Sequence, residues 1–294
     1  MSITKAKIID SVTLSKNIIY ELQKKITIFK EKNKKELHIA IIQLGDNESS
    51  QLYIKKKIQI AEAIGIKISH QKFSQNEKED NIIKSIHNLN QSKEISGIIL
   101  QMPIPDNFNK LKLLNAINAQ KDIDGLNPIN VGLLFSKSNQ CFIPPTAQGC
   151  LELLKFYKIE IKSKHIVIVN RSNLVGKPLV ELFLREDATI TICHSQTKNL
   201  ANITKLGDIV ICAIGKANYF TKEYFNENAT VIDVGVNKIL DKNSKIKTVG
   251  DVNFENVKEH VAYLTPVPKS IGPLTIAFLL INSFIAAQLN NMQE

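Results

Sequence analysis

The sequence predicts a two-domain α/β protein. Short runs rich in Ile and Val alternate with segments of helical period, which is typical of βα units built around a parallel sheet. With 294 residues and 44% apolar side chains, the chain can bury one large core or two moderate ones. The alternation stops at residues 122–146 and again at 266–273, where Gly and Pro are frequent. Two such interruptions indicate that the chain leaves one domain and later returns to it.

Each expected strand is short and apolar, and each expected helix carries apolar residues at helical spacing. The strands are 38–44, 66–71, 95–100, 165–169, 188–193, 208–213, 230–234 and 261–264. The helices are 49–64, 81–89, 111–119, 179–186, one beginning near Ala147 and a long one from about 273 to 289. We expect residues 1–143 with 270–294 to form one domain, completed by the last helix, and 144–269 to form the other. A cleft between two domains is a favoured place for a ligand.

Composition disfavours nucleic-acid and membrane proteins. The formal charge is +10, but the lysines are spread through helices and turns, with the densest run at residues 30–35. Trp is absent and aromatic residues make up 6%, so bases would find few stacking platforms. The longest apolar run, 274–287, contains Thr275, Asn282 and Ser283, so we expect no membrane span. Residues 1–10 show neither a signal-peptide core nor a presequence, which indicates a cytoplasmic protein.

The cysteines indicate neither a disulfide framework nor a zinc site. They form no C-x-x-C pair, and no histidine lies near them at zinc-site spacing. We therefore expect buried free thiols and no metal ion at Cys141, Cys150, Cys193 and Cys212.

A possible phosphate-binding turn follows the strand at 165–169. The segment Asn170-Arg-Ser-Asn-Leu-Val-Gly-Lys-Pro178 leads from this strand into a helix, where a dinucleotide-binding unit presents backbone N–H groups to an anion. The usual G-x-G-x-x-G is missing, and only Gly176 remains. The alternative is an ordinary strand-to-helix connection with Pro178 in the first helical turn.

The next strand ends where such folds read the adenosine ribose. An enzyme that selects NAD usually has Asp or Glu there, whereas this chain has Cys193-His-Ser-Gln-Thr197. A carboxylate would repel a 2′-phosphate, while Arg171 could pair with it and Ser195 could donate to it. If a dinucleotide binds, the pattern favours NADP over NAD.

A tyrosine and two lysines on one helix are candidates for the catalytic residues. Lys56 and Lys57 follow Tyr53 at i+3 and i+4, so both lie on its side of the helix and spacing alone cannot choose between them. A surface lysine run beside a half-buried tyrosine is the alternative. The strand at 95–100 ends in Gln101-Met-Pro-Ile-Pro105, at the sheet edge where parallel sheets carry ligands. The paired acids of Lys121-Asp-Ile-Asp-Gly-Leu-Asn-Pro128 follow in a polar turn.

Together these segments resemble the bifunctional methylenetetrahydrofolate dehydrogenase/methenyltetrahydrofolate cyclohydrolase family, over nearly the whole chain. One matching piece would be weak evidence, but the pieces follow one another in the family's order. They are 53–57, 97–103, 121–125, 171–178, 193–197, 233–237, 250–252 and 266–275.

The resemblance implies NADP-dependent oxidation of 5,10-methylenetetrahydrofolate and then hydrolysis of the methenyl product to 10-formyltetrahydrofolate. It implies that Lys57 is the catalytic lysine, Tyr53 positions the folate, Gln101 orients the lysine and Asp124 holds the pterin. The chemistry agrees, because a full ammonium would oppose the cation that hydride loss leaves, so the lysine should be partly neutral. Asp122 is expected to be structural, since only the second acid of the turn matches the pterin ligand.

The resemblance also implies further binding residues and a homodimer formed through the cofactor domain. On the folate side these are Leu100, Met102, Pro268, Ile271, Gly272 and Pro273, in addition to Tyr53, Gln101 and Asp124. For NADP they are Asn170, Arg171, Ser172, Ser195 and Val236. The expected partners are thus tetrahydrofolate one-carbon derivatives and a second copy of the chain, with no nucleic acid and no membrane.

Several positions depart from the family pattern without removing a catalytic group. Asn170 stands where Gly is usual, and its side chain would lie near the phosphates. Lys269 and Ser270 replace a Gly-Gly pair. In Pro144-Pro-Thr-Ala-Gln-Gly149 a Pro and an Ala replace Cys and Pro, and Leu133 occupies a commonly basic site. Two competing interpretations are a binding protein that kept the fold without turnover and an amino-acid or shikimate-type dehydrogenase.

Overall fold

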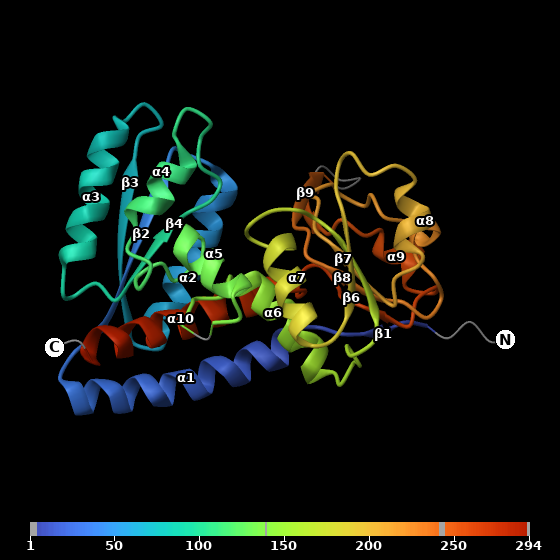
Figure 1. Ribbon diagram of the computed structural model, residues 1–294, viewed down its shortest axis with the longest axis horizontal. Helices are drawn as coiled ribbons and strands as arrows, with labels where there is room; N and C mark the ends of the chain where they lie inside the picture. Colours follow the sequence, from blue (N-terminus) through green and yellow to red (C-terminus); the bar gives the residue numbers. More distant parts are fainter. Residues whose placement is uncertain (1–4, 139, 241–244, 293–294) are drawn as a thin grey trace. The chain divides into compact units, whose positions relative to one another are not determined.

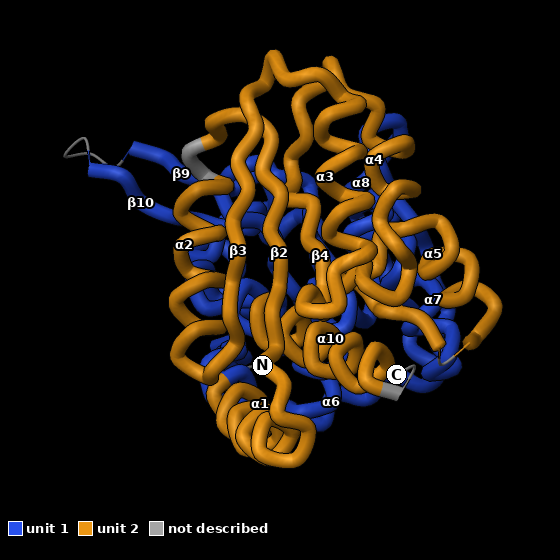
Figure 2. Tube along the Cα trace, turned by 90° about the vertical axis from the view of Figure 1, so that its left-hand side faces the viewer, with its two compact units in different colours: residues 1–15, 146–275 blue, residues 16–145, 276–294 orange. Residues whose placement is uncertain are grey.

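The structure is a computed structural model that describes residues 5–138, 140–240 and 245–292, with its helices and strands labelled in Figure 1. It divides into two compact units, coloured separately in Figure 2. Unit 1 comprises residues 1–15 and 146–275, and unit 2 comprises residues 16–145 and 276–294.

Unit 2 is built on a small parallel sheet with the strand order β3-β2-β4. Its strands are β2 (Leu37–Leu44), β3 (Ile66–Phe73) and β4 (Gly97–Leu100). Every residue of β2 is buried, as expected for a central parallel strand whose two faces are both covered. The helices of this unit are α1 (Val12–Asn33), whose first turn belongs to unit 1, α2 (Glu48–Ala63), α3 (Glu79–Gln91), α4 (Lys110–Ala116), α5 (Pro128–Phe135) and α10 (Gly272–Met292) from Ile276 onward.

The last helix, α10, closes the core of unit 2. Its Phe284 meets Phe29 of α1 edge to face, with ring centroids 5.8 Å apart. Its buried Asn282 donates from Nδ2 to the carbonyl oxygens of Ile123 and Ile143, so a polar side chain joins the helix to the turn at 121–128. By length and composition α10 could cross a membrane, but more than half of its apolar stretch is buried within the fold. It therefore serves this unit as a core helix.

Unit 1 is a doubly wound sheet with the strand order β1-β11-β8-β7-β5-β6, paired in parallel throughout. The strands are β1 (Lys7–Ile8), β5 (His165–Val169), β6 (Thr189–Cys193), β7 (Ile209–Cys212), β8 (Thr230–Asp233) and β11 (Tyr263–Leu264). Because β6 and β7 flank β5 on opposite sides, the chain reverses its direction of winding there. In such sheets this switch point is where ligands bind.

Short helices and a hairpin complete unit 1. The helices are α6 (Pro145–Phe156), α7 (Gly176–Arg185), α8 (Leu200–Thr204), α9 (Phe254–Val257) and the 3₁₀ turn η1 (Lys222–Tyr224). Strands β9 (Asn237–Leu240) and β10 (Ile246–Val249) form a separate antiparallel pair. Cys150, Cys193 and Cys212 are buried free thiols as expected, whereas Cys141 of unit 2 is only half-buried.

The compact units divide the chain at other residues than the domains expected from the sequence. Residues 1–15 were expected in the catalytic domain but cluster with unit 1, because β1 pairs in parallel with β11. Ser11 continues this attachment through its N–H and its hydroxyl, which both donate to the Lys269 carbonyl. The chain also returns at residue 276 rather than 270. A two-residue strand with exposed side chains offers no periodicity that sequence inspection could detect.

The turn that carries Asp124 depends on glycine at position 125. Gly125 has a φ of +67°, and a Cβ there would lie 2.3 Å from the carbonyl oxygen of Phe142. We expect Gly125→Ala to lower the free energy of unfolding by more than about 1–2 kcal/mol, the usual cost of left-handed backbone for a residue with a Cβ. Gly132→Ala is the control, because a Cβ in α5 would meet nothing within 4 Å and should stabilise by roughly 0.5–1 kcal/mol. Denaturant unfolding measures both, and equal stabilities would contradict this account.

Candidate functional site

Burial separates the two lysines that spacing left open. Helix α2 begins after Asn47, whose side chain accepts a hydrogen bond from the Ser50 N–H at 2.9 Å. Further along this helix Lys56 is exposed, while Lys57 is only 5% exposed and points into unit 2. An amine at that position loses most of its hydration.

Three of the predicted catalytic side chains lie together in unit 2. Lys57 donates from Nζ to Oε1 of Gln101 at 3.1 Å, and its Nζ lies 4.9 Å from the ring centroid of Tyr53. Gln101 follows β4 directly and is itself fixed, since its backbone N–H donates to Ile42 O and its Nε2 donates to Met102 O at 2.7 Å. The lysine therefore sits between an aromatic ring and an oriented amide oxygen.

The charge of Asp124 acts on the same lysine. Burial lowers the pKa of Lys57 below its ordinary value, and the Asp124 carboxylate partly offsets this by favouring the ammonium. Conversely, burial raises the pKa of Asp124, and Lys57 lowers it. The amine is thus more readily neutral than an exposed lysine, with an acidic group close enough to respond to its charge.

The other acid of the turn, Asp122, is anchored inside the protein. It is 2% exposed, and its Oδ2 accepts from the backbone N–H of Asn127 at 2.7 Å and from Nδ2 of Asn130 at 2.9 Å. Burial raises its pKa to about 7. Lys121 fixes the start of the same turn by donating from Nζ to three carbonyls at the end of α3, those of Leu89, Asn90 and Ser92.

The remaining residues expected on the folate side fall in both units. Leu100 ends β4 and is buried, and Met102 follows Gln101 with its carbonyl accepting from the Ser50 hydroxyl. The others lie in unit 1, at or just before the start of α10, where Ile271 is buried, Gly272 and Pro273 are half-buried and Pro268 is exposed.

The replaced Gly-Gly pair keeps a glycine-like backbone. Lys269 has a φ of +90°, a conformation that L side chains rarely adopt, and its side chain is exposed. The Ser270 hydroxyl donates to the Asp233 carbonyl, so this departure from the family pattern adds an anchor within unit 1.

In unit 1 the Asn170 side chain organises the β5–α7 turn. Its Oδ1 accepts from the N–H groups of Ser172 at 2.8 Å and of Gly176 at 2.9 Å, and its Nδ2 donates to Ala213 O. The amide therefore faces the protein's own backbone. Gly176 is required here, because a Cβ would lie 2.1 Å from the Asn170 carbonyl oxygen.

These residues fit a dinucleotide that carries a 2′-phosphate. Arg171, Ser195 and Val236 are exposed, Ser172 is half-buried, and the turn at 193–197 that follows β6 contains no acid. The N–H of His194 donates to the Thr197 hydroxyl at 2.8 Å, which closes that turn. A tight strand-to-helix turn, an arginine and a hydroxyl supply what such a cofactor needs.

Two family models match the chain, one over each half. The model described as tetrahydrofolate dehydrogenase/cyclohydrolase, catalytic domain, matches residues 9–124, and the NAD(P)-binding domain of the same family matches residues 144–291. The bifunctional protein FolD of Rickettsia typhi is 50% identical over 276 residues, covering 94% of this chain and 95% of its own. This chain belongs to the tetrahydrofolate dehydrogenase/cyclohydrolase family.

Solved structures of tetrahydrofolate dehydrogenase/cyclohydrolases agree with this assignment over the full length. The FolD enzyme of Campylobacter jejuni has a TM-score of 0.91 at 37% identity, covering 97% of this chain and 99% of its own. The Trypanosoma brucei enzyme, solved with NADP and an inhibitor, has a TM-score of 0.92 at 31% identity, covering 97% and 98%. The predicted family, two-domain α/β fold, bifunctional enzyme class and NAD(P)-type cofactor are confirmed, and a shikimate-type enzyme is excluded.

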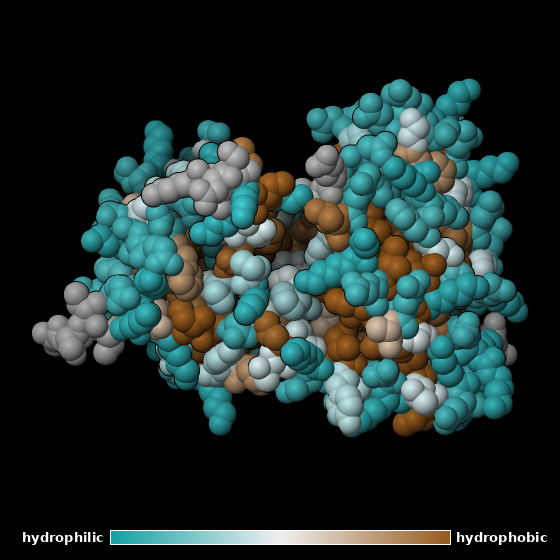
Figure 3. Space-filling view, turned by 180° about the vertical axis from the view of Figure 1, so that it is seen from behind, coloured by the Kyte–Doolittle hydropathy of each residue, from teal (hydrophilic) through white to brown (hydrophobic). Residues whose placement is uncertain are grey.

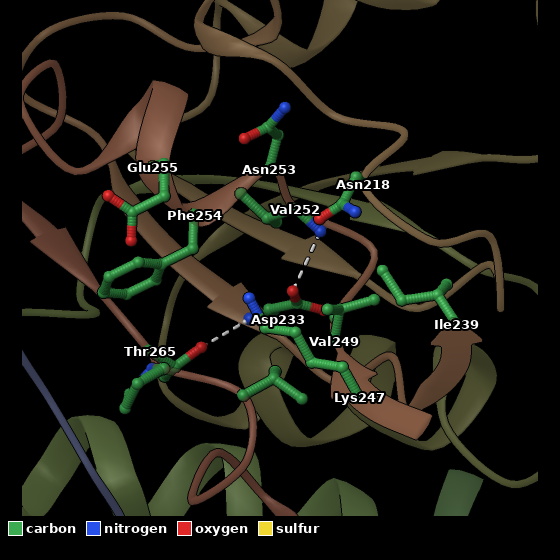
Figure 4. Close-up of a pocket in the computed structure, with 13 residues that line it drawn as sticks. Asn218, Asp233, Ile239, Lys247, Val249, Val252, Asn253, Phe254, Glu255 and Thr265 are labelled. Carbon is green, nitrogen blue, oxygen red and sulfur yellow. Dashed lines mark hydrogen bonds between the residues drawn. The ribbon is translucent and has the colours of Figure 1, made fainter. Parts of the chain in front are cut away.

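Apart from Val236, sequence reasoning gave no role to the residues of segments 233–237 and 250–252, although it used both segments for the family resemblance. They line a cavity of about 300 Å³ in unit 1, shown in Figure 4, which contains none of the predicted site residues. Buried Asp233 lies at its centre and accepts from the Val252 N–H at 2.9 Å. The available signal was Asp233, two residues before Gly235, and Asp251, directly after Gly250. Within the described residues, no group of three or more His, Cys, Asp or Glu could hold a metal ion.

Proposed function

We propose that Lys57, Tyr53, Gln101 and Asp124 form the site at which this family member oxidises 5,10-methylenetetrahydrofolate with NADP and hydrolyses the 5,10-methenyl product to 10-formyltetrahydrofolate. The observation that carries the proposal is the buried Lys57 amine bonded to Gln101. A binding protein without turnover would have no need to maintain a desolvated amine, which costs stability.

Burial of the lysine suits the oxidation step. NADP, when bound, accepts the hydride that leaves the carbon bridging the two folate nitrogens. The product is a cation delocalised over these nitrogens, and a neighbouring ammonium would raise its energy by charge repulsion. Since burial lowers the pKa of Lys57, the neutral amine is accessible without that penalty. The Tyr53 ring, 4.9 Å from the amine, gives the folate a flat surface to pack on.

In hydrolysis the neutral Lys57 acts as a general base. It takes a proton from water as the oxygen attacks the methenyl carbon, while Gln101 holds the amine by accepting one of its N–H groups. The bond from that carbon to N5 then breaks and N5 gains a proton, leaving the formyl group on N10 and one proton released overall. Asp124 accepts from the donor-rich edge of the pterin, and its charge steadies the transient ammonium of Lys57.

NADP is held by the exposed surface of unit 1 at the switch point. Arg171 pairs with the 2′-phosphate and Ser195 donates to it, Asn170 and Ser172 shape the turn beside the phosphates, and Val236 offers an apolar contact. Leu100 and Met102 contribute to the folate side of unit 2, and the family pattern adds Pro268, Ile271, Gly272 and Pro273 of unit 1 as folate-binding residues.

We also propose that the enzyme is a cytoplasmic homodimer that joins through unit 1. On the β9–β10 pair, Leu240 lies opposite Ile246, and these side chains are 69% and 70% exposed. Two large apolar side chains at such exposure suit an interface between copies. Hydrophilic side chains cover much of the face seen in Figure 3, which supports a protein that enters no membrane. The scarcity of aromatic residues supports the absence of a nucleic-acid partner despite the basic charge.

Replacement of the buried lysine tests the site. We expect Lys57→Met to reduce cyclohydrolase activity by at least about a hundredfold, because the general base is lost, while NADP still binds. Lys56→Met is the matched control, since its side chain is exposed on the same helix, and it should keep both activities. Separate assays follow NADPH and 10-formyltetrahydrofolate. Normal hydrolysis by Lys57→Met would disprove the assignment.

Replacement of the arginine tests cofactor selection. Arg171→Ala should lower the ratio of kcat/KM for NADP to that for NAD by about tenfold or more, the usual worth of a charge-assisted hydrogen bond. Lys177→Ala, an exposed cation in the first turn of α7, should leave this ratio unchanged. If Arg171→Ala retains its selectivity, another group reads the 2′-phosphate.

The dimer is tested by charging its proposed surface. The double variant Leu240→Glu with Ile246→Glu should sediment as a monomer, because two carboxylates cannot be buried together. Leu206→Glu provides the control, since this residue of unit 1 is 66% exposed, follows α8 and belongs to neither β9 nor β10, so the change should leave the dimer intact. A wild-type monomer, or a dimer that survives the double change, would rule out this interface.

A further inference from the structure

The loop that follows β7 is held by a single buried carboxylate. The backbone N–H groups of Ile214, Gly215 and Lys216 all donate to Asp251, at 2.5 Å, 2.9 Å and 2.9 Å. Asp251 is completely buried, so water does not compete for these bonds. Three successive amides on one carboxylate fix the course of residues 214–216, including the left-handed Gly215 with its φ of +68°.

The same loop is tied on its other side to the phosphate turn. The residue before it, Ala213, accepts through its carbonyl from Nδ2 of Asn170, while Oδ1 of Asn170 holds the turn of β5. In the sheet, Val169 and Cys212 are register partners at the carboxyl ends of β5 and β7. Asn170 and Ala213 therefore follow directly at the switch point, where doubly wound sheets bind dinucleotides.

Asp251 is itself held in place by two further hydrogen bonds. Its N–H donates to Oδ1 of Asp233 at 3.0 Å, and its Oδ1 accepts from Nδ2 of Asn237 at 2.8 Å. Gly235 leaves room for it, because a Cβ there would lie 2.2 Å from the carboxyl carbon. These contacts explain why segments 233–237 and 250–252 each carry an acid within two residues of a glycine, although neither segment contains a proposed catalytic group.

We propose that Asp251 is a positioning residue for the NADP-dependent step, acting through the 213–216 loop that it holds together with Asn170. The inference rests on the proposed cofactor site. In a doubly wound sheet the β5–β6 half binds the adenosine part, and the half beyond the switch point, which begins with β7, faces the nicotinamide part. The loop lies on this second half, so its shape governs where the reacting ring can sit.

Asn170 makes this connection particular to the present chain. The family usually has Gly at this position. A glycine has no side chain that could donate to the Ala213 carbonyl or accept from the Gly176 N–H. Here one side chain couples the phosphate turn to the loop that Asp251 fixes. The two halves of the cofactor site are consequently set by a continuous series of hydrogen bonds within unit 1.

The test compares two ligands on the full-length enzyme. Adenosine 2′,5′-bisphosphate reports on the adenosine half, whereas NADP reports on both halves, and calorimetry gives each Kd. Asp251→Asn places an amide NH₂ against backbone donors, so we expect NADP to bind about tenfold more weakly with the bisphosphate unchanged. The KM for NADP should rise in the same way. Cyclohydrolase activity on the methenyl substrate, whose proposed catalytic groups Lys57 and Gln101 lie in unit 2, should stay within about twofold of wild type.

A second variant covers the case in which Asp251→Asn does not fold. Asn237→Ala removes one bond to the carboxylate but keeps the carboxylate, and should weaken NADP binding by about threefold with the bisphosphate again unchanged. Asn228→Ala, an exposed asparagine of the same unit, is the matched control and should bind both ligands normally.

The binding results separate the proposed cofactor site from the proposed role of Asp251. If the wild type binds neither nucleotide, the proposed cofactor site itself is wrong. If the wild type binds both and the variants keep full NADP affinity, the positioning role of Asp251 is wrong. Loss of both ligands together with cyclohydrolase activity would show that Asp251 only maintains the fold, which would equally overturn the proposal.

Discussion

The desolvated amine of Lys57 is the constraint on which unit 2 depends. Burying it costs hydration that one hydrogen bond to Gln101 does not replace, and the opposing charge of Asp124 offsets only part of that cost. The surroundings must therefore be rigid enough to keep water out. The fully buried β2, the cap on α2 and the α10 helix, bonded through Asn282 to the Asp124 turn, supply that rigidity.

In unit 1 two buried carboxylates hold loops in place. Asp233 and Asp251 are almost fully buried, yet they accept hydrogen bonds from backbone N–H groups and thereby fix loops. Burial raises the pKa of Asp233 to about 7, which its amide donors counteract. In unit 2 burial lowers the pKa of Lys57, the proposed general base, whereas in unit 1 the carboxylates hold backbone beside the proposed cofactor site. The same chain thus buries one ionisable group for its proposed chemistry, Lys57, and two others that hold backbone, Asp233 and Asp251.

Sequence reasoning located most of the sheet because Ile- and Val-rich strands are buried on both faces, as in β2 and β5, the latter at its predicted bounds of 165–169. It missed β1, which is two exposed residues long, and the β9–β10 pair, whose large apolar side chains face solvent. Spacing could not separate Lys56 from Lys57, because both follow Tyr53 on one helix face and only tertiary packing buries one of them. Asp251 escaped notice for a similar reason, since its partners at 214–216 lie more than thirty residues away.

The departures from the family pattern change how backbone is held and leave the reacting groups intact. Lys269 occupies left-handed space at a cost of about 1–3 kcal/mol, and two hydrogen bonds from Ser11 to its carbonyl fix it there. Asn170 likewise replaces the freedom of glycine with bonds to Gly176 and Ala213. In both places hydrogen bonds made by a serine or an asparagine fix backbone that a glycine would leave free until a ligand binds. Pre-ordered backbone reduces the entropy lost when a ligand binds, so these replacements should alter affinity while the chemistry of Lys57 stays the same.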